Sequence, residues 1–372
     1  MIRRGIEIPS ELIAQGRANQ LVVFVGAGVS MDSPSSLPSF DGLADEIARG
    51  TGESPLAAEN SEGHSTLEPL DRFLGRLEQD WGVEVHLKAS QILASPMSEP
   101  NRLHRLVVKL FGPSGTPRIV TTNFDRHLEG ALGDQRVEEA RSFVAPALPL
   151  GSDFEGIVYV HGRLGGDPKN LVLTDRDFGR AYLTEGWARR FLRGLFSTYD
   201  VLFVGYSHND PVVSYLARGL PPDSERKRYA LTAEGRSDHW KLLGIEPIEY
   251  ATPGGSHERS AELLEDLGLV IGRGASGHEE ELKKIVGRGV AELDAEGRDF
   301  LLWLLESPLR HLFFSHTKDA EWTAWMNGVG QLAELFDGRA LDRDLNQWFA
   351  RDPLGEPGHE ALHLLSNQPG IP

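Results

Sequence analysis

The chain has 372 residues, contains no cysteine and carries a formal net charge of -17 at pH 7. The absence of cysteine excludes disulfides and thiolate metal sites, and the negative charge disfavours unassisted binding to nucleic acid because a polyanion is repelled at long range. No run approaches the roughly 20 apolar residues that cross a bilayer, and the start of the chain lacks the apolar core of a signal peptide. We therefore expect a cytoplasmic globular protein without a membrane partner, built from one large domain and a smaller one.

The first part of the chain predicts one buried strand and its covering elements. Residues 9–19 predict a helix that leads into the apolar run 21–25 (LVVFV), which is typical of a strand buried on both faces of a parallel sheet. Residues 33–43, rich in Pro and Ser, predict a loop over the end of that strand. A short helix is expected at 43–49, and the polar stretch 50–66 is expected to lack regular structure.

Apolar residues at helical spacing predict two further helices, around residues 67–77 and 103–110. Three apolar segments beyond them end in polar residues, and read RIVTTNFD at 118–125, GIVYVHG at 156–162 and VLFVGYSHND at 201–210. Short strands are also predicted at 228–232 and 247–250. Because ligands of open α/β sheets bind outside the carboxyl ends of the strands, these polar residues are expected to share one site. We predict a Rossmann-like α/β domain over residues 1–270, a parallel sheet with helices on both faces.

The pattern of apolar residues changes beyond about residue 270, where several glycines are followed by apolar residues at helical spacing. Residues 271–372 predict a smaller all-α region for sensing or assembly. Its last apolar segment, 361–365, has little to pack on, so we expect either a longer protein or a partner that covers these faces. The alternative is that Trp303, Trp322 and Trp325 are simply the core of a helical subdomain.

The strand at 21–25 ends at a turn with two glycines, Gly26 and Gly28. Glycine lets backbone N–H groups approach a phosphate, and the N-terminus of a following helix favours an anion. The turn lacks the third glycine of the dinucleotide fingerprint, because residue 31 is Met. Two interpretations stay open: a cradle for a pyrophosphate, or glycines that serve close packing only.

Five short motifs, in their order along residues 15–255, resemble the sirtuin-like superfamily. They read GAGVS at 26–30, LPSF at 37–40, TNFD at 122–125, HG at 161–162 and GYS at 205–207. The resemblance implies an NAD-binding domain in which Asn123 and His161 are the catalytic pair at the nicotinamide ribose. It also implies that NAD+ is held at the matching positions, namely Gly26, Ala27, Gly28, Ser30, Phe40, Asp125, Gly205, Tyr206, Ser207 and Asp210. For Asp210 and its neighbour His208, lining the adenosine pocket and shaping the turn are equal alternatives.

The chain departs from the deacylase sirtuins in two ways. Residues 39–41 read SFD where the deacylases carry Asp-Phe-Arg, and the four zinc-binding cysteines are missing, so we expect no metal. The segments PSF at 38–40, LVLTDRDF at 171–178 and GYSHNDP at 205–211 resemble instead the zinc-free branch that supplies NAD-consuming effectors of bacterial anti-phage systems. That resemblance implies an NAD+ glycohydrolase of abortive infection, regulated by homo-oligomerisation, a partner defence protein or a phage-derived activator.

The chemistry of the residues agrees with cleavage of the nicotinamide glycosidic bond. The developing oxocarbenium-like ribose needs a group that fixes it, an acceptor for a proton and a held water. Asn123 offers an amide donor and acceptor, and His161 can act as a base near neutral pH.

Other interpretations remain for these residues and for the chain. His161 could be a structural histidine, and Asn123 with Asp125 could cap the next helix. The alternative functions are an NAD-dependent protein deacylase and a non-catalytic module that senses NAD+ or ADP-ribose. The remaining histidines, such as His104 and His127, have no ligand-like partners in the sequence.

Overall fold

The computed structural model of the chain describes residues 2–3, 6–59, 65–111, 116–133, 141–206, 226–272, 275–306, 310–317 and 320–328. The chain divides into two compact units, one of residues 11–272 and one of residues 1–10 with 273–372. The predicted role of the second unit in sensing or assembly stays a prediction. Ser207, His208, Asp210 and the segment 361–365 lie outside the described residues.

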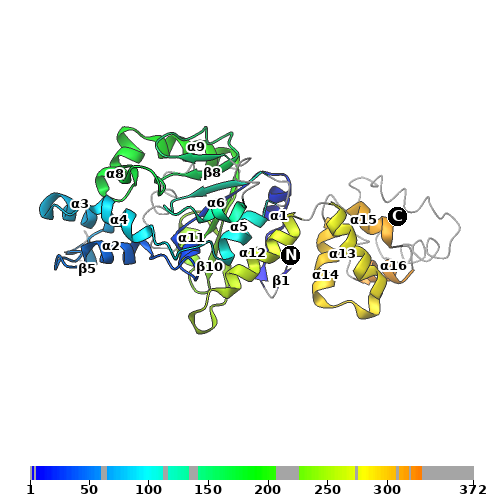
Figure 1. Ribbon diagram of the computed structural model, residues 1–372. Coiled ribbons are helices and arrows are strands. Elements are labelled where there is room, and N and C mark those ends of the chain that lie inside the picture. The colour runs from blue at the N-terminus through cyan, green and yellow to red at the C-terminus, as the bar shows by residue number, and fades with distance from the viewer. Residues whose placement is uncertain are drawn as a thin grey trace. The chain divides into compact units, whose positions relative to one another are not determined.

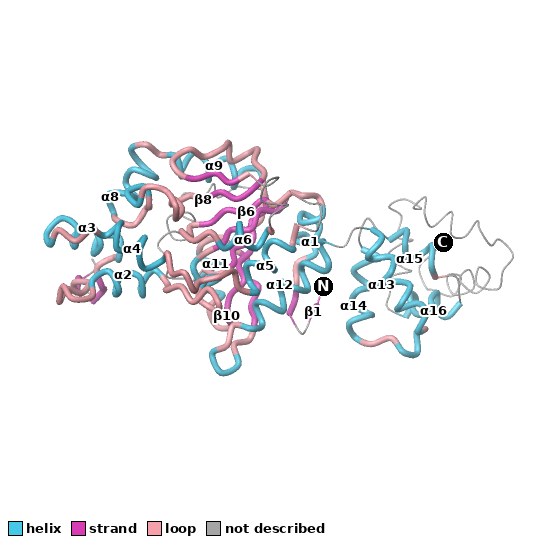
Figure 2. The backbone as a smooth tube through the Cα atoms, viewed as in Figure 1, coloured by secondary structure: helices cyan, strands magenta, loops and turns pink. Residues whose placement is uncertain are grey.

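The larger unit is built on a seven-stranded parallel sheet in the order β11-β10-β9-β3-β6-β8-β7 (Figure 2). Its strands are β3 (Leu21–Val25), β6 (Arg118–Thr121), β7 (Ser142–Val144), β8 (Gly156–Tyr159), β9 (Asp200–Val204), β10 (Arg228–Ala233) and β11 (Glu246–Tyr250). The chain builds β6 and β8 on one side of β3 and later adds β9, β10 and β11 on the other. The strand order therefore reverses at β3, which is the topological switch point where α/β proteins bind ligands. The predicted Rossmann-like fold is confirmed.

The helices lie in layers around this sheet (Figure 1). In the larger unit they are α1 (Ser10–Arg17), α2 (Phe40–Ala48), α3 (Leu70–Trp81), α4 (Val85–Leu93), α5 (Arg102–Lys109), α6 (His127–Leu132), α8 (Asp175–Gly179), α9 (Trp187–Thr198), α11 (Ser237–Leu242) and α12 (Glu258–Gly272). Shorter helical turns are η1 (Ala27–Ser30), η2 (Pro168–Asn170), η3 (Arg180–Thr184) and η4 (Pro253–Gly255). Helices α9 and α11 cover one face of the sheet, and α1, α5, α6 and α12 lie over the other.

The core on the α9 face follows directly from the sequence pattern. All five residues of β3 are buried, as expected for a strand covered on both faces. Phe24 of β3 packs against Phe203 of β9 and Phe196 of α9, with ring centroids 5.3 and 6.4 Å apart. Trp187 and Phe191 of α9 belong to the same buried cluster, one helical turn apart. Burial of these aromatic side chains fixes α9 on the sheet.

A second core lies in the insertion between β3 and β6. Leu43 and Ile47 of α2 pack with Phe73 and Leu77 of α3, and Val85 of α4 joins them. This small helical layer also includes α8 through its contacts with α3. It forms the part of the molecule that faces the carboxyl end of the sheet (Figure 1).

The structure corrects four details of the expected elements. Residues 57–59 and 65–67 pair as antiparallel strands β4 (Ala57–Glu59) and β5 (Ser65–Leu67), in and just beyond the stretch 50–66 for which no strand was expected. Strands of three residues are too short to show a period in the sequence. For the same reason edge strand β7 was not predicted. The helix predicted from residue 67 begins at Leu70, and the double-glycine turn leads into the short 3₁₀ turn η1 rather than an α-helix.

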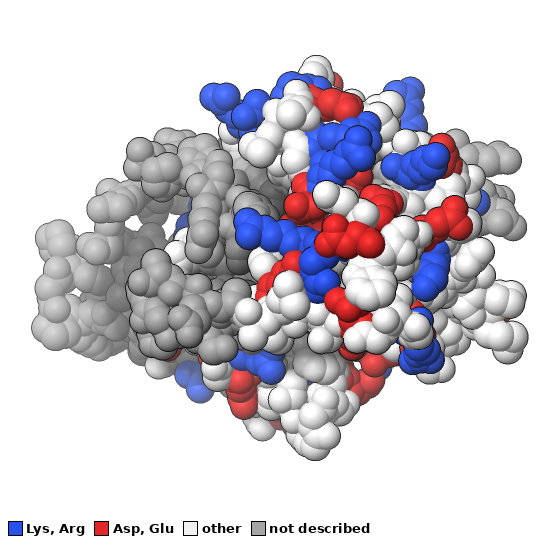
Figure 3. Space-filling model, turned by 90° about the vertical axis from the view of Figure 1, so that its left-hand side faces the viewer, with Lys and Arg blue, Asp and Glu red and all other residues white. Residues whose placement is uncertain are grey.

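Acidic and basic side chains are interspersed on the face seen in Figure 3. Among the ion pairs of the larger unit, Arg76 of α3 pairs with Glu53 and Glu68 at 2.7 and 3.1 Å. Among the described residues on this face, basic side chains alternate with acidic ones.

The smaller unit contains β1 (Ile2–Arg3), β2 (Ile6–Glu7), α13 (Ala275–Arg288), η5 (Val290–Glu292), α14 (Ala295–Glu306), α15 (Arg310–His316) and α16 (Ala320–Gly328). Its aromatic residues pack on one another: the ring centroid of Phe313 lies 6.3 Å from that of Trp322 and 6.2 Å from that of Trp325. These two tryptophans therefore belong to the packing of this unit. None of the helices in the described part of the chain combines the length and apolar character that spanning a bilayer requires.

Candidate functional site

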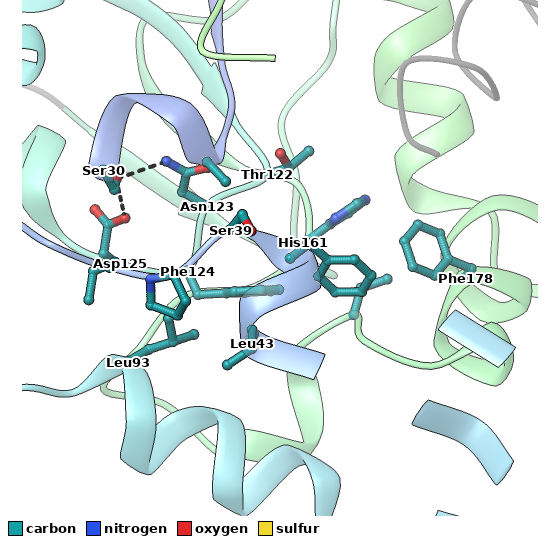
Figure 4. Close-up of a pocket in the computed structure, with 15 residues that line it drawn as sticks. Ser30, Ser39, Leu43, Leu93, Thr122, Asn123, Phe124, Asp125, His161 and Phe178 are labelled. Carbon is teal, nitrogen blue, oxygen red and sulfur yellow. Dashed lines mark hydrogen bonds between the residues drawn. The ribbon is translucent and has the colours of Figure 1, made fainter. Parts of the chain in front are cut away.

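A pocket lies at the carboxyl end of the sheet, beside the switch strand β3 (Figure 4). Its empty space is about 680 Å³, including solvent at the mouth. The ends of β3, β6 and β8 supply its polar side chains, while α2, α4 and α8 supply apolar ones. The residues predicted from the sequence that line it are Ala27, Ser30, Phe40, Asn123, Asp125 and His161. Segments far apart in the sequence thus meet at one site.

Ser30 is the centre of a buried polar network on one side of the pocket (Figure 4). Its hydroxyl donates to Asp125 Oδ2 at 2.8 Å, because a carboxylate oxygen can only accept. Ser30 Oγ then accepts from Asn123 Nδ2 at 3.1 Å and from His104 Nε2 at 3.1 Å. The single hydroxyl proton and both lone pairs of Ser30 are therefore used.

His104 was not predicted as part of the site. It lies on α5, is fully buried, and must carry a proton on Nε2 to donate to Ser30. The backbone N–H of Asn101 donates to His104 Nδ1 at 3.2 Å, within the capping box that begins α5. Burial lowers the pKa of His104 to about 4, so the ring is neutral at pH 7.

Asp125 performs two tasks. Its Oδ2 accepts from Ser30, and its Oδ1 accepts from the backbone N–H of His127, the first residue of α6, at 3.0 Å. Asp125 thus both accepts from a backbone N–H at the start of α6 and lines the pocket.

Asn123 presents one buried polar atom that has no partner. Its Nδ2 donates to the carbonyl oxygen of Gly26 at 3.1 Å and to Ser30 Oγ, and since a carbonyl cannot donate, this fixes which end of the amide is nitrogen. Its Oδ1 is buried and makes no hydrogen bond within the described part of the chain. A buried acceptor without a donor costs about 1–3 kcal/mol, so this oxygen marks a place where a ligand hydroxyl or water is favoured.

His161 lies on the opposite side of the pocket, in an aromatic surrounding (Figure 4). Only 3% of its surface is exposed, and burial lowers its pKa to about 3, opposed by a weaker effect of the Asp177 carboxylate. Its Nε2 lies 2.9 Å from the hydroxyl oxygen of Tyr182, and its ring meets Phe178 edge-on at 5.2 Å. The imidazole is therefore neutral across the physiological pH range.

The two glycines of the turn are explained by packing. A Cβ on Gly26 or Gly28 would lie 2.8 Å from the carbonyl oxygen of Gly205, and the N–H of Gly28 donates to that oxygen at 2.8 Å. Gly205 itself has a φ of +74°. The ends of β3 and β9 thus meet backbone to backbone. The packing interpretation accounts for these glycines, and their role in holding a pyrophosphate stays a prediction.

Tyr206 is held by hydrogen bonds to the ends of β3 and β6. Its hydroxyl is 2.8 Å from Thr122 Oγ1 and donates to the carbonyl oxygen of Val25 at 3.2 Å. Gly26, Gly28, Gly205 and Tyr206 are absent from the pocket wall, although they position the turn that carries Ser30.

Sequence reasoning missed several residues of the pocket wall. They include Thr122, Phe124, Leu93, Val172 and Phe178. Phe178 falls in the segment 171–178 that was noted only as a resemblance. The signal that could have identified Phe178 is its position in the first helical turns after the N-cap residue Thr174. Within the described residues no group of three or more His, Asp or Glu side chains is arranged as metal ligands.

Comparison with known proteins shows which family the sequence around this pocket resembles. Residues 117–248, from β6 to β11, match the family model of the SIR2-like domain. The protein named "Uncharacterized protein y4cA" from Sinorhizobium fredii (strain NBRC 101917 / NGR234) is 30% identical over 379 residues, a match that covers 93% of this chain and 30% of that protein. The chain thus spans less than a third of the length of this curated relative.

Among solved structures, one described as "Structural Basis for the Mechanism and Regulation of Sir2 Enzymes" is similar with a TM-score of 0.39 and 15% identity, over 70% of this chain and 94% of the other. The family match covers β6 and β8, whose carboxyl ends line the pocket, and it includes both Asn123 and His161. Residues 117–248 thus match a SIR2-like domain, in agreement with the sirtuin-like domain that the sequence motifs predicted.

Proposed function

We propose that the chain is an NAD+ glycohydrolase that cleaves NAD+ to nicotinamide and ADP-ribose. The observation that carries the proposal is the buried, unpartnered Oδ1 of Asn123 in the same pocket as a neutral His161. The sirtuin-like domain supports NAD+ as the substrate. The donor set also fits a ribose, whose hydroxyl groups can donate to an amide oxygen and to an imidazole.

Asn123 would fix the ribose or the attacking water. Because its Nδ2 is held by Gly26 and Ser30, its Oδ1 cannot rotate away, and a hydroxyl that donates to it is oriented at little entropic cost. The satisfied network behind it keeps this geometry in place before the ligand arrives.

His161 would accept the proton. In the overall reaction a water oxygen bonds to the ribose carbon, the glycosidic electron pair leaves with nicotinamide as a neutral molecule, and one water proton passes to the imidazole. A neutral ring is ready to accept this proton at pH 7, and no general acid is required for the leaving group. The apolar wall of Phe40, Phe124 and Phe178 would cover a flat aromatic ring and exclude bulk water.

The test is NAD+ consumption and nicotinamide release by the purified chain, compared with Asn123→Ala and His161→Ala. We expect each substitution to lower kcat by about 10²–10⁴-fold, the range for loss of acid–base or positioning groups. Ser197→Ala, which removes an exposed hydroxyl of α9 that donates to the carbonyl oxygen of Arg193, is a control outside the pocket wall. Equal turnover in all of these proteins would refute the assignment.

The same assay separates the alternative functions. A deacylase would consume NAD+ only with an acyl-lysine peptide, whereas the hydrolase needs none. A sensing module would bind NAD+ or ADP-ribose tightly without turnover under any condition.

We further propose that the activity belongs to a regulated effector of anti-phage defence. Unregulated NAD+ hydrolysis would starve the cell, so the activity would be switched by oligomerisation, a partner defence protein or a phage-derived activator. The much greater length of the relative is consistent with further sensing or assembly regions in proteins of this kind. Cellular NAD+ should then fall during phage infection in cells that carry the native chain in its full reading frame, and should not fall with Asn123→Ala.

A further inference from the structure

The only hydrogen bond of the His161 ring within the described residues is with Tyr182. The hydroxyl oxygen of Tyr182 is 2.9 Å from Nε2, and the ring nitrogen Nδ1 has no hydrogen-bond partner there. The two rings also meet edge-on, with centroids 6.0 Å apart and an interplanar angle of 84°. Tyr182 therefore contacts the imidazole twice, through a hydrogen bond to one ring nitrogen and through an edge-on ring contact.

Tyr182 is held in place by the segment that carries it. It lies in η3, a π-helical turn that directly continues α8, and π-turns of this kind recur at functional sites. Its ring stacks on Phe178 with an interplanar angle of 13° and a centroid distance of 6.0 Å. Both aromatic rings thus enclose His161 as one unit.

The start of α8 is anchored to the helical layer. The side chain of Asp177 accepts from the hydroxyl and backbone N–H of Thr174, at 2.8 and 2.9 Å, in a capping box. The same carboxylate lies 2.8 Å from Nε2 of His86 on α4. This hydrogen-bonded pair raises the pKa of His86, which stabilises its charged form. These hydrogen bonds hold the start of α8, which carries Phe178 and leads to Tyr182, and so favour a fixed position for Tyr182.

The direction of the hydrogen bond follows from the chemistry expected of His161. A neutral imidazole has one N–H and one lone pair. If Nε2 carries the proton and donates to Tyr182, the lone pair of Nδ1 is available to a proton of the attacking water. The same hydrogen bond then persists when Nδ1 is protonated, and it stabilises the buried imidazolium without any rotation of the phenol. In the reverse arrangement the tyrosine would occupy the lone pair and Nδ1 could accept no proton.

We propose that Tyr182 is the positioning residue of His161: its hydroxyl oxygen accepts the Nε2 proton and leaves Nδ1 as the base. This inference rests on the proposed function, because it assigns the proton-accepting atom of that reaction. One O–H bond of the attacking water breaks as its oxygen bonds to the ribose carbon, that proton forms the N–H bond at Nδ1, and the Nε2 proton stays on His161, donated to Tyr182, throughout.

The kinetic test is Tyr182→Phe, which removes the hydroxyl and keeps the stacked ring. We expect kcat for NAD+ hydrolysis to fall by about 10- to 100-fold, as for loss of other groups that orient a reactive side chain from behind it, with KM unchanged. The matched control is Tyr199→Phe, which removes a hydroxyl that donates to the carbonyl oxygen of Ser152 away from the pocket. Wild-type kcat in Tyr182→Phe, in an enzyme that His161→Ala inactivates, would overturn the role of Tyr182 and leave the proposed function intact.

A second readout is independent of turnover. Long-range ¹H–¹⁵N NMR of histidine-labelled chain, with the His161 signals assigned from His161→Gln, reports which ring nitrogen carries the proton. We expect Nε2–H alone in the wild-type chain, and a mixture of both tautomers in Tyr182→Phe but not in Tyr199→Phe. A proton on Nδ1 in the wild-type chain, or an unchanged tautomer in Tyr182→Phe, would overturn the proposal. Absence of any NAD+ hydrolysis by the wild-type chain would instead refute the proposed function, and the NMR result would still judge the role of Tyr182.

Discussion

The two sides of the pocket are built on opposite principles. On the Asn123 side, Ser30 links three polar side chains and uses all of its hydrogen-bonding capacity. On the His161 side, aromatic rings surround one imidazole that makes a single hydrogen bond within the described residues. A dense polar network resists rotation of its members, whereas an apolar surrounding changes the protonation equilibrium of the group inside it. The Asn123 side therefore fixes the orientation of its side chains, and the His161 side keeps the imidazole in its neutral form.

The largest effect expected from this comparison concerns protonation, since each side contains one buried neutral histidine. The pKa values of His104 and His161 are lowered to about 4 and about 3, below the value of about 6.5 expected in the unfolded chain. The unfolded chain then binds the extra protons, so stability is present above pH 6.5 and is lost as the pH falls towards the folded-state pKa. We expect the free energy of unfolding to fall by about 2 kcal/mol for each histidine between pH 7.5 and 5.

Urea unfolding of the native chain at a series of pH values measures this loss. In His161→Gln the pH-dependent part of the loss should shrink by about half, leaving the share of His104. His86 has a raised pKa and contributes in the opposite direction, so it stabilises the fold as the pH falls towards 6.5 and offsets part of the loss there. This contribution is the same in the native chain and in His161→Gln, so the difference between the two proteins still reports His161 alone. A free energy of unfolding that stays constant from pH 7.5 to 5 would contradict the neutral state of both rings.

The next effect tests the network on the Asn123 side. Ser30→Ala leaves Asn123, Asp125 and His104 each short of one buried partner, and we expect a loss of about 2–3 kcal/mol in the free energy of unfolding. Ser39→Ala, which removes a single helix-cap hydrogen bond, should cost only about 1 kcal/mol. If urea unfolding gives the same loss for both variants, the network contributes no more than an ordinary cap.

The smallest effect tests the aromatic side. Phe178→Leu removes the edge contact with His161, and we expect a stability loss of about 0.5–1.5 kcal/mol. Because water then reaches the imidazole more easily, the pKa of His161 should rise towards its ordinary value. An NMR pH titration of the His161 ring measures the shift, and Phe124→Leu, on the same pocket wall but without a ring contact to His161, should leave it unchanged. A larger shift in Phe124→Leu than in Phe178→Leu would reverse the assignment of the two sides.

Much of the fold could be predicted because buried parallel strands give continuous apolar runs. The strands at 21–25, 118–121 and 200–204 are of this kind, and polar residues that follow the first two meet in one pocket at the carboxyl end of the sheet. The sirtuin-like domain was likewise predictable from the order of short motifs along the chain.

The contacts that surround these residues were not predictable. His104 meets Ser30 only because α5 packs beside η1, and Tyr182 meets His161 only because a π-turn follows α8. Nothing in the local sequence of a histidine reveals which distant residue will bury it. The glycines Gly26 and Gly28 show the converse: a local signal pointed to a ligand, while the close approach of Gly205 is a tertiary fact.

The meeting of Gly28 and Gly205 also has a mechanical consequence. Two main chains in direct contact have no rotamers with which to absorb a displacement, so the turn before Ser30 and the end of β9 move as one stiff body. A displacement of the end of β9 would therefore be transmitted to Ser30, and through its hydrogen bond to the side-chain amide of Asn123.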